Sequence, residues 1–191
     1  MAEAEDSDDS GETLESILQS TEGNSILFIG ESINNLVSQA ICSIYTNPSG
    51  ETGSVFFLIN SLGGTASDTY LCCSFMDEIK KERDLYTICY GNAQSAAAAI
   101  LANGTKGKRY AVDSVVVMVH RVTPDPDTPK SLGMAYNTKY LHILSKQSGR
   151  PLTELKKAVE RVSYFTAKEA KDFGLIDKII PYSRIPTLLK K

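Results

Sequence analysis

Histidine is scarce in this chain of 191 residues, and tryptophan is missing altogether. The sequence holds two histidines and four cysteines, and no two cysteines form a Cys-x-x-Cys pair. Zinc sites usually combine several such ligands at short spacing, so we expect no metal site. The cysteines lie in apolar stretches, two of them adjacent, which gives no disulfide framework and favours a reducing compartment.

Long apolar runs and early basic residues are missing too. No run approaches the roughly 18 residues of a membrane span, and the first 15 residues hold seven acids and no base, unlike a targeting peptide. We expect residues 1–12 to be a disordered acidic tail, because they bury too little apolar surface to offset their ordering entropy. Residues 13–191 are then expected to form a single domain.

Charge is divided unevenly along the chain. Residues 1–105 hold 15 acids and 3 bases, whereas residues 106–191 hold 8 acids and 17 bases. The bases of the second half are spread through predicted helices beside acids. That pattern argues against a nucleic-acid-binding surface.

Short apolar runs alternate with helical patterns from Ser25 onward. Strands are predicted at residues 25–30, 54–60, 85–91, 108–111, 115–120 and 175–181. Helices are predicted at residues 13–20, 34–45, 65–81, 95–102, 131–147, 151–161 and 167–172. This alternation predicts an α/β fold built on right-handed crossovers.

A glycine pair follows the second predicted strand. The segment INSLGGTAS runs from the strand end at Asn60 through Gly63 and Gly64 into a helix. Paired glycines let the backbone approach a ligand and point N–H groups at it. A plain strand-to-helix turn explains the same residues, and the lack of a following Gly-Lys-Ser/Thr excludes a phosphate loop.

Ser95 and His120 are candidate reactive groups. Ser95 opens a helix of alanines directly after a buried strand, where it could cap the helix or act as a nucleophile favoured by the helix dipole. The spacing differs from the Gly-x-Ser-x-Gly elbow of α/β-hydrolases. His120 ends an apolar run and could be a simple boundary residue. Since His142 lies within a predicted helix, His120 is the natural base for Ser95.

Four segments of the chain occur in the order and spacing of a known family. They are FLINSLGG, TICYGNAQSAAA, KGKRYAVDSVVVMVH, and SGRPLTELKKAVER followed by FTAKEAKDFGLIDKII. Together they resemble the proteolytic subunit of the Clp protease, from about Ser25 to Ile180. The resemblance implies a crotonase-like α/β fold of repeated β-β-α units with a helical handle, assembled into stacked heptameric rings.

The resemblance also implies roles for individual residues. The activity would be serine-type endopeptidase hydrolysis of unfolded polypeptides that a Clp-type ATPase unfoldase delivers. Ser95 would attack the scissile carbonyl and His120 would transfer the proton. The N–H groups of Gly64 and Ala96 would hold the oxyanion.

Further matches concern partners. Phe56 and Leu58 match the apolar pocket on which the unfoldase docks, and Arg161 matches an arginine that pairs across the ring interface. The other partners would be copies of this chain or paralogous subunits, with no cofactor, nucleic acid or membrane. The expected location is a bacterial-type cytoplasm or the stroma or matrix of an organelle.

The sequence departs from the family at the position of the triad acid. Val162 stands where the family has an aspartate, and the nearby Glu160 would need a shifted strand to replace it. Losing correct orientation of the histidine costs serine proteases on the order of 10⁴ in rate. We therefore expect weak activity. The loop after His120 is also shorter than usual and holds three prolines, which stiffen it.

Two alternatives remain open at this point. The chain could be a non-catalytic structural subunit of a mixed ring. It could also be a crotonase-fold enzyme acting on an acyl-thioester, with the amides of Gly64 and Ala96 as its oxyanion hole. The absence of a paired glutamate base near these loops speaks against that second alternative.

Overall fold

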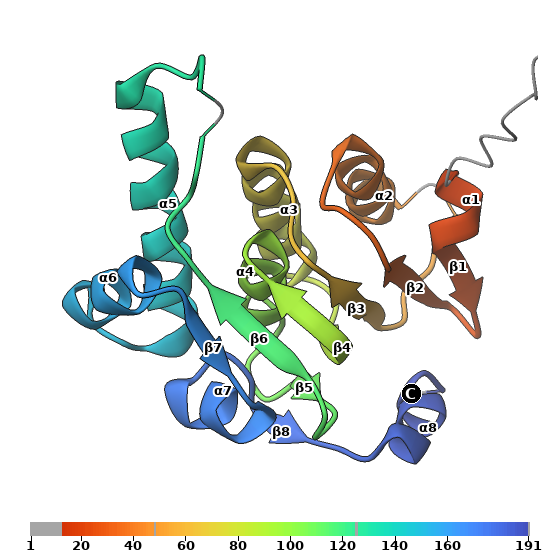
Figure 1. Cartoon of the computed structure of the whole chain (residues 1–191). Coiled ribbons are helices and arrows are strands. Elements are labelled where there is room, and N and C mark those ends of the chain that lie inside the picture. Colours follow the sequence, from red (N-terminus) through yellow and green to blue (C-terminus); the bar gives the residue numbers. More distant parts are fainter. Residues whose placement is uncertain (1–12, 48, 125, 191) are drawn as a thin grey trace, which may run out of the picture.

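The computed structural model describes residues 13–47, 49–124 and 126–190, and the tail predicted for residues 1–12 lies outside them. In this part of the chain eight strands form one sheet (Figure 1). The strands are β1 (Leu18–Thr21), β2 (Asn24–Ile29), β3 (Val55–Ser61), β4 (Leu85–Gln94), β5 (Arg109–Ala111), β6 (Val116–Val119), β7 (Ser163–Phe165) and β8 (Lys178–Ile179). The helices are α1 (Leu14–Ile17), α2 (Asn35–Thr46), α3 (Ala66–Ile79), α4 (Ala96–Ala102), α5 (Lys130–Ser148), α6 (Leu152–Glu160), α7 (Ala167–Phe173) and α8 (Ile185–Leu188), with a 3-10 turn at Tyr182–Arg184. None of these helices is long and apolar enough to cross a membrane.

Parallel strands form the centre of the sheet. The strand order is β1-β2-β3-β4-β5-β8, with β6 beside the end of β4 and β7 beside β6. Strands β2 to β5 run parallel, and α2, α3 and α4 make the crossovers between them. The predicted α/β fold is confirmed, because parallel neighbours require such helical connections.

Both faces of the central strands are buried. Alternate residues of β2, β3 and β4 face the main core under α2, α3 and α4. The residues between them form a second apolar cluster, which consists of Ile26, Phe56, Leu58, Tyr86, Ile88, Tyr110 and Leu188. Leu188 comes from α8, which lies below the strands in Figure 1 while α2 and α3 lie above them. The C-terminal segment therefore covers the sheet face that the crossover helices leave open.

Two predicted elements differ markedly in extent from the structure. The helix predicted at 13–20 ends at Ile17, and the residues that follow form β1, which pairs antiparallel with β2. The predicted capping chemistry of Thr13 is present, because its side chain and that of Ser16 form a capping box. The strand predicted at 175–181 shrinks to the two residues of β8. The edge strand β7 was not predicted at all.

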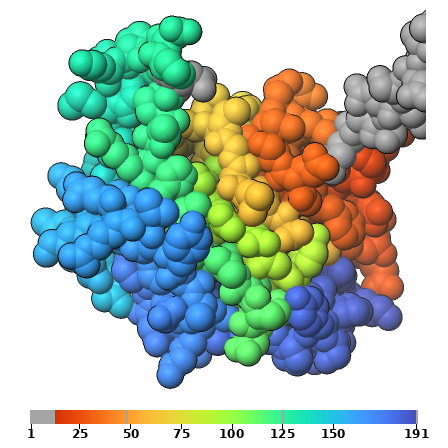
Figure 2. All heavy atoms as spheres, in the orientation of Figure 1, coloured from red at the N-terminus to blue at the C-terminus, as the bar shows by residue number. Residues whose placement is uncertain are grey.

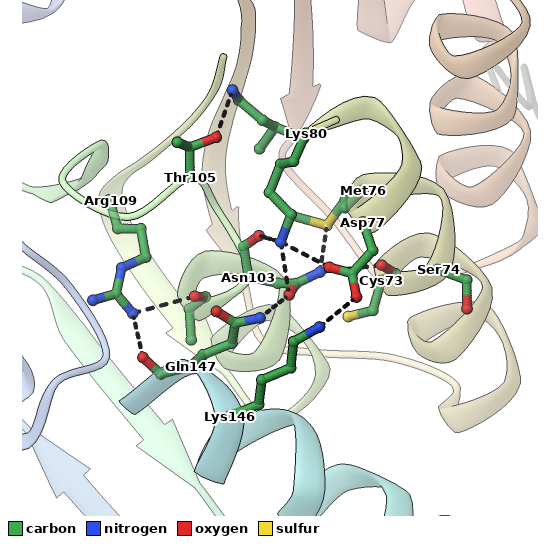
Figure 3. Close-up of polar contacts among 12 residues, drawn as sticks. Cys73, Ser74, Met76, Asp77, Lys80, Asn103, Thr105, Arg109, Lys146 and Gln147 are labelled. Atoms are coloured by element: carbon green, nitrogen blue, oxygen red, sulfur yellow. Dashed lines mark hydrogen bonds and ion pairs between the residues drawn. The ribbon is translucent and has the colours of Figure 1, made fainter. Parts of the chain in front are cut away.

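A buried polar network joins α3, the end of α4 and α5 (Figure 3). The Asn103 side-chain amide donates to the Cys73 carbonyl at 3.1 Å, and Lys80 Nζ donates to the Asn103 carbonyl at 2.8 Å. Gln147 of α5 donates to Asn103 Oδ1. Burial alone would raise the pKa of the Asp77 carboxyl, but its contacts with Lys80 and Lys146 outweigh that effect and lower it.

Arg109 is the largest polar group of the interior. It is 1% exposed and forms two hydrogen bonds with the Asp177 carboxylate, at 2.9 and 2.6 Å. Its remaining donors reach the carbonyls of Ala102, Gln147 and Gly174. Arg109 therefore ties α4, α5 and the segment after α7 to β5. Burial would raise the pKa of Asp177, but Arg109 and the Gly107 N–H outweigh burial and lower it.

Replacing Asp177 with Asn should destabilise the protein by about 3 kcal/mol, because it leaves a buried guanidinium without its counter-charge. Urea unfolding followed by circular dichroism measures this. The Asp177 pKa is lowered by folding, so its stabilising effect is present above the ordinary aspartate pKa and lost as pH falls through the lowered value. The difference between wild type and Asp177→Asn should therefore shrink on acidification.

Asp84→Asn is the matched control. Asp84 pairs with Lys108 on the surface, where the two side chains are 48% and 26% exposed. Exposed pairs contribute at most about 1 kcal/mol, so this variant should unfold close to the wild-type midpoint. Equal losses in the two variants would refute the structural role assigned to Arg109.

Candidate active site

Strand β4 changes partners halfway along its length. Its first half pairs with β5 through Thr87, and its last residues pair with β6 through Asn92–Gln94. The change coincides with an irregularity against β3, where the register moves from Ile59↔Cys89 to Ser61↔Ala93. Asn60 Oδ1 accepts from the Asn92 N–H at 2.9 Å at this point. The irregularity turns the end of β4 toward β6 and so brings Ser95 close to the chain at Met118–His120.

Ser95 has an unusual backbone conformation. Its φ is 53° and its ψ is −118°, a region that non-glycine residues seldom adopt. Its N–H donates to the Met118 carbonyl at 2.8 Å. Although Ser95 precedes α4, its side chain makes no capping hydrogen bond. Ser95 therefore occupies the N-cap position of α4 as predicted, but its hydroxyl is directed elsewhere and does not cap the helix.

The Ser95 hydroxyl lies next to His120. This histidine follows β6 directly, and its Nε2 lies 2.8 Å from Ser95 Oγ. The other ring nitrogen, Nδ1, has no hydrogen-bond partner among residues 13–47, 49–124 and 126–190. The structure thus brings together the serine and histidine that the sequence singled out. His142, in contrast, is exposed on α5.

The glycine turn lies against this pair. Gly63 has φ +116°, and a side chain there would place Cβ 2.8 Å from Ser95 Cβ. A Cβ on Gly64 would overlap the backbone of Ile33, whose N–H donates to Gly63 O at 2.8 Å. In the described chain the Gly64 N–H has no acceptor. Ala96 lies in the first turn of α4, where N–H groups lack helical partners, so both amides are free to receive a negative charge.

A cavity of about 590 Å³ surrounds these groups. Its lining includes Gly64, Ser95, Ala96 and His120, and part of its wall comes from α5 and the loop before it. Figure 2 shows α5 and this loop standing out from the body at the upper left. Apart from His120, every described lining residue is uncharged. The cavity therefore suits a neutral, extended ligand segment.

Val162 lies where a third catalytic group would be expected. Strand β7 pairs antiparallel with β6 in the register Val119↔Ser163, which places Val162 opposite His120 when the ladder is extended by one residue. Val162 is 46% exposed and has φ 53°, which is rare for a β-branched residue. Glu160, which would need a shifted strand to replace the acid, is exposed and forms no ion pair with His120 within the described residues.

Comparison with known proteins identifies the relatives of this chain. A family model described as Clp protease matches residues 9–183. The ATP-dependent Clp protease proteolytic subunit 1 of Thermobifida fusca (strain YX) is 30% identical over 176 residues, which cover 83% of this chain and 75% of the relative. The chain belongs to the Clp protease family. The resemblance noted in the sequence is thereby confirmed, and membership implies a serine-type peptidase.

The two residues predicted for unfoldase docking are not on the surface. Phe56 is fully buried and Leu58 is 6% exposed, both in the cluster that also contains Leu188. Arg161, the residue matched to the ring interface, is exposed at the end of α6. In this Clp protease family member, the two predicted docking residues share a buried cluster with Leu188 of the C-terminal helix α8.

Sequence reasoning missed two residues that shape the site. Asn60 receives the hydrogen bond that accompanies the turn of β4, and Tyr140 of α5 donates its hydroxyl to the Ser95 carbonyl at 2.9 Å. An asparagine at a strand end is a usable signal for irregular pairing. A tyrosine within a helix carries no comparable signal, because its partner lies 45 positions away in sequence.

Gly64→Ala should destabilise the fold by about 3 kcal/mol, because the new methyl group overlaps the Ile33 backbone. Urea unfolding measures the loss. Gly30→Ala provides the comparison, since Gly30 has an ordinary φ and open space within 4 Å of a Cβ. Equal stability of the two variants would contradict the close approach of this turn to Ile33.

Proposed function

We propose that this chain is a proteolytic-type subunit of an ATP-dependent Clp complex, with a serine-type endopeptidase site of low intrinsic activity. The 2.8 Å contact between His120 Nε2 and Ser95 Oγ is the observation that carries the proposal. The positive φ of Ser95 supports it, because strained residues of this kind cluster at active sites. The uncharged cavity around the pair is large enough for a segment of extended polypeptide.

The proposed reaction proceeds in two steps. Ser95 Oγ attacks the scissile carbonyl carbon while its proton passes to His120 Nε2, and the amides of Gly64 and Ala96 hold the oxyanion. The carbon–nitrogen bond then breaks as His120 returns the proton to the leaving amine. Water attacks the acyl-serine by the same proton transfers, which releases the second peptide and restores Ser95.

Val162 is the proposed reason for low activity. A carboxylate next to the second ring nitrogen would hold the imidazole in the correct tautomer and stabilise its charged form. An isopropyl side chain can do neither. The subunit would then contribute its fold and cavity to a ring, alone or beside paralogous subunits, and it would depend on them for most peptide hydrolysis.

The proposed partners follow from family membership. An ATPase unfoldase would deliver unfolded chains to a chamber formed by stacked heptameric rings, with Arg161 at a subunit interface. Phe56 and Leu58 would contribute to the docking surface from beneath α8. Docking there would engage α8 itself or the rim of the cluster, because both residues are buried in the cluster that also contains Leu188.

Ser95→Ala should abolish cleavage of a fluorogenic peptide, because no other nucleophile takes its place beside His120. The assay compares initial rates of purified wild type and variant at equal concentration. Ser74→Ala, an exposed serine on α3, is the control and should retain the wild-type rate. Equal rates for wild type and Ser95→Ala would favour the non-catalytic structural subunit.

Val162→Asp should increase peptide cleavage on the order of 10²-fold, part of the roughly 10⁴ that a correctly placed acid contributes. Aspartate also tolerates the left-handed φ at this position better than valine does. Initial rates with the same peptide measure the gain.

Val162→Asn separates the charge from the backbone effect. Asparagine adopts left-handed φ as readily as aspartate but carries no charge. A gain confined to the aspartate variant supports an electrostatic role at His120. Equal gains in both variants would attribute the wild-type defect to backbone strain instead.

A further inference from the structure

We propose that Tyr140 is a positioning residue, which holds the Ser95 peptide in the conformation that directs the hydroxyl at His120. This inference rests on the proposed function, since it concerns the reactivity of Ser95. Tyr140 belongs to α5 and lines the same cavity as Ser95. It takes no direct part in the proton transfer between Ser95 Oγ and His120 Nε2.

The geometry of Tyr140 suits this role. Its side chain is 3% exposed, and its hydroxyl donates to the Ser95 carbonyl at 2.9 Å. Burial raises the pKa of the phenol, so the group stays protonated and remains a donor throughout the neutral range. A buried hydroxyl without this acceptor would lose its hydrogen bond to water without compensation.

Few contacts hold the strained peptide of Ser95. Its N–H is held by Met118, and its carbonyl accepts from the Ala98 N–H at 3.1 Å and from Tyr140. The contact with Ala98 belongs to the first turn of α4 and moves with that helix. Tyr140 is therefore the contact that fixes the carbonyl relative to a separate element. Without it, the Ser95 carbonyl keeps only its contact within α4, and the backbone at Ser95 can shift so that Oγ moves away from His120.

Helix α5 also forms the cavity wall. Tyr136 lines the cavity one turn before Tyr140, and its carbonyl accepts from the Tyr70 hydroxyl of α3 at 2.6 Å. One helix is thus anchored to α3, shapes the space for a ligand and holds the nucleophile. A displacement of α5 by a seated polypeptide acts directly on Ser95 through Tyr140.

Labelling by a small alkyl fluorophosphonate tests this inference without requiring rapid turnover. Ser95 Oγ displaces fluoride and forms an oxygen–phosphorus bond, while the proton passes to His120. Tyr140→Phe should lower the maximal inactivation rate constant about 10-fold, the effect of losing one buried hydrogen bond, and leave the inhibition constant unchanged. A mere loosening of the cavity wall would raise the inhibition constant instead.

Tyr182→Phe is the matched control. It removes a tyrosine hydroxyl that donates to the Tyr90 carbonyl at 2.8 Å, in the C-terminal segment far along the chain from Ser95. It should label at the wild-type rate. A second variant carries 4-aminophenylalanine in place of Tyr140, which keeps a weaker N–H donor, and should label at an intermediate rate. If Tyr140→Phe does not fold, the labelling rate of the 4-aminophenylalanine variant alone tests the proposal.

The outcomes separate the two proposals. Unchanged inactivation rate constants in the Tyr140 variants would overturn the positioning role while leaving the nucleophile in place. Failure of the wild type and of Val162→Asp to label at all would overturn the proposed function, and the inference with it. A reduced rate constant that the 4-aminophenylalanine variant partly restores supports both.

Discussion

The change of partner along β4 is the constraint on which the site depends. A regular parallel strand beside β5 would carry Ser95 along the line of the sheet and away from the end of β6. The irregular pairing at Asn60 instead lets the last residues of β4, Asn92–Gln94, pair with β6. A single hydrogen-bonded ladder then fixes the serine and histidine segments relative to each other, and the 2.8 Å contact follows.

Small residues make this arrangement possible. The Gly63–Gly64 turn lies so close to Ser95 and Ile33 that a methyl group at either glycine meets neighbouring atoms. On the other side, the alanines of α4 are all buried, which allows the helix to pack directly beneath the strand ends. Close packing around a strained residue means that the surroundings determine its conformation, as strained sites require.

Much of this could be predicted from the sequence, because the signals were local. Apolar periodicity located the parallel strands and the crossover helices, and Asn34 and Thr65 cap α2 and α3 close to the predicted starts. The short strands β1 and β7 were missed, since a strand of three or four residues is defined by its partner across the sheet. Tyr140 was missed because its role likewise depends on a partner, Ser95, that is distant in the sequence.

At position 162 the backbone conformation suits an aspartate or asparagine, but the side chain is that of valine. The chain directly before β7 places a residue opposite His120, and the backbone there has the left-handed φ that an aspartate or asparagine would adopt more readily. Valine carries no charge, and it adopts a positive φ less readily than either residue. A regular turn would accommodate valine at lower cost, so the surrounding structure determines the backbone conformation of Val162. Positive φ values therefore occur both at Ser95, which contacts His120, and at Val162, which lies opposite His120 in the extended ladder.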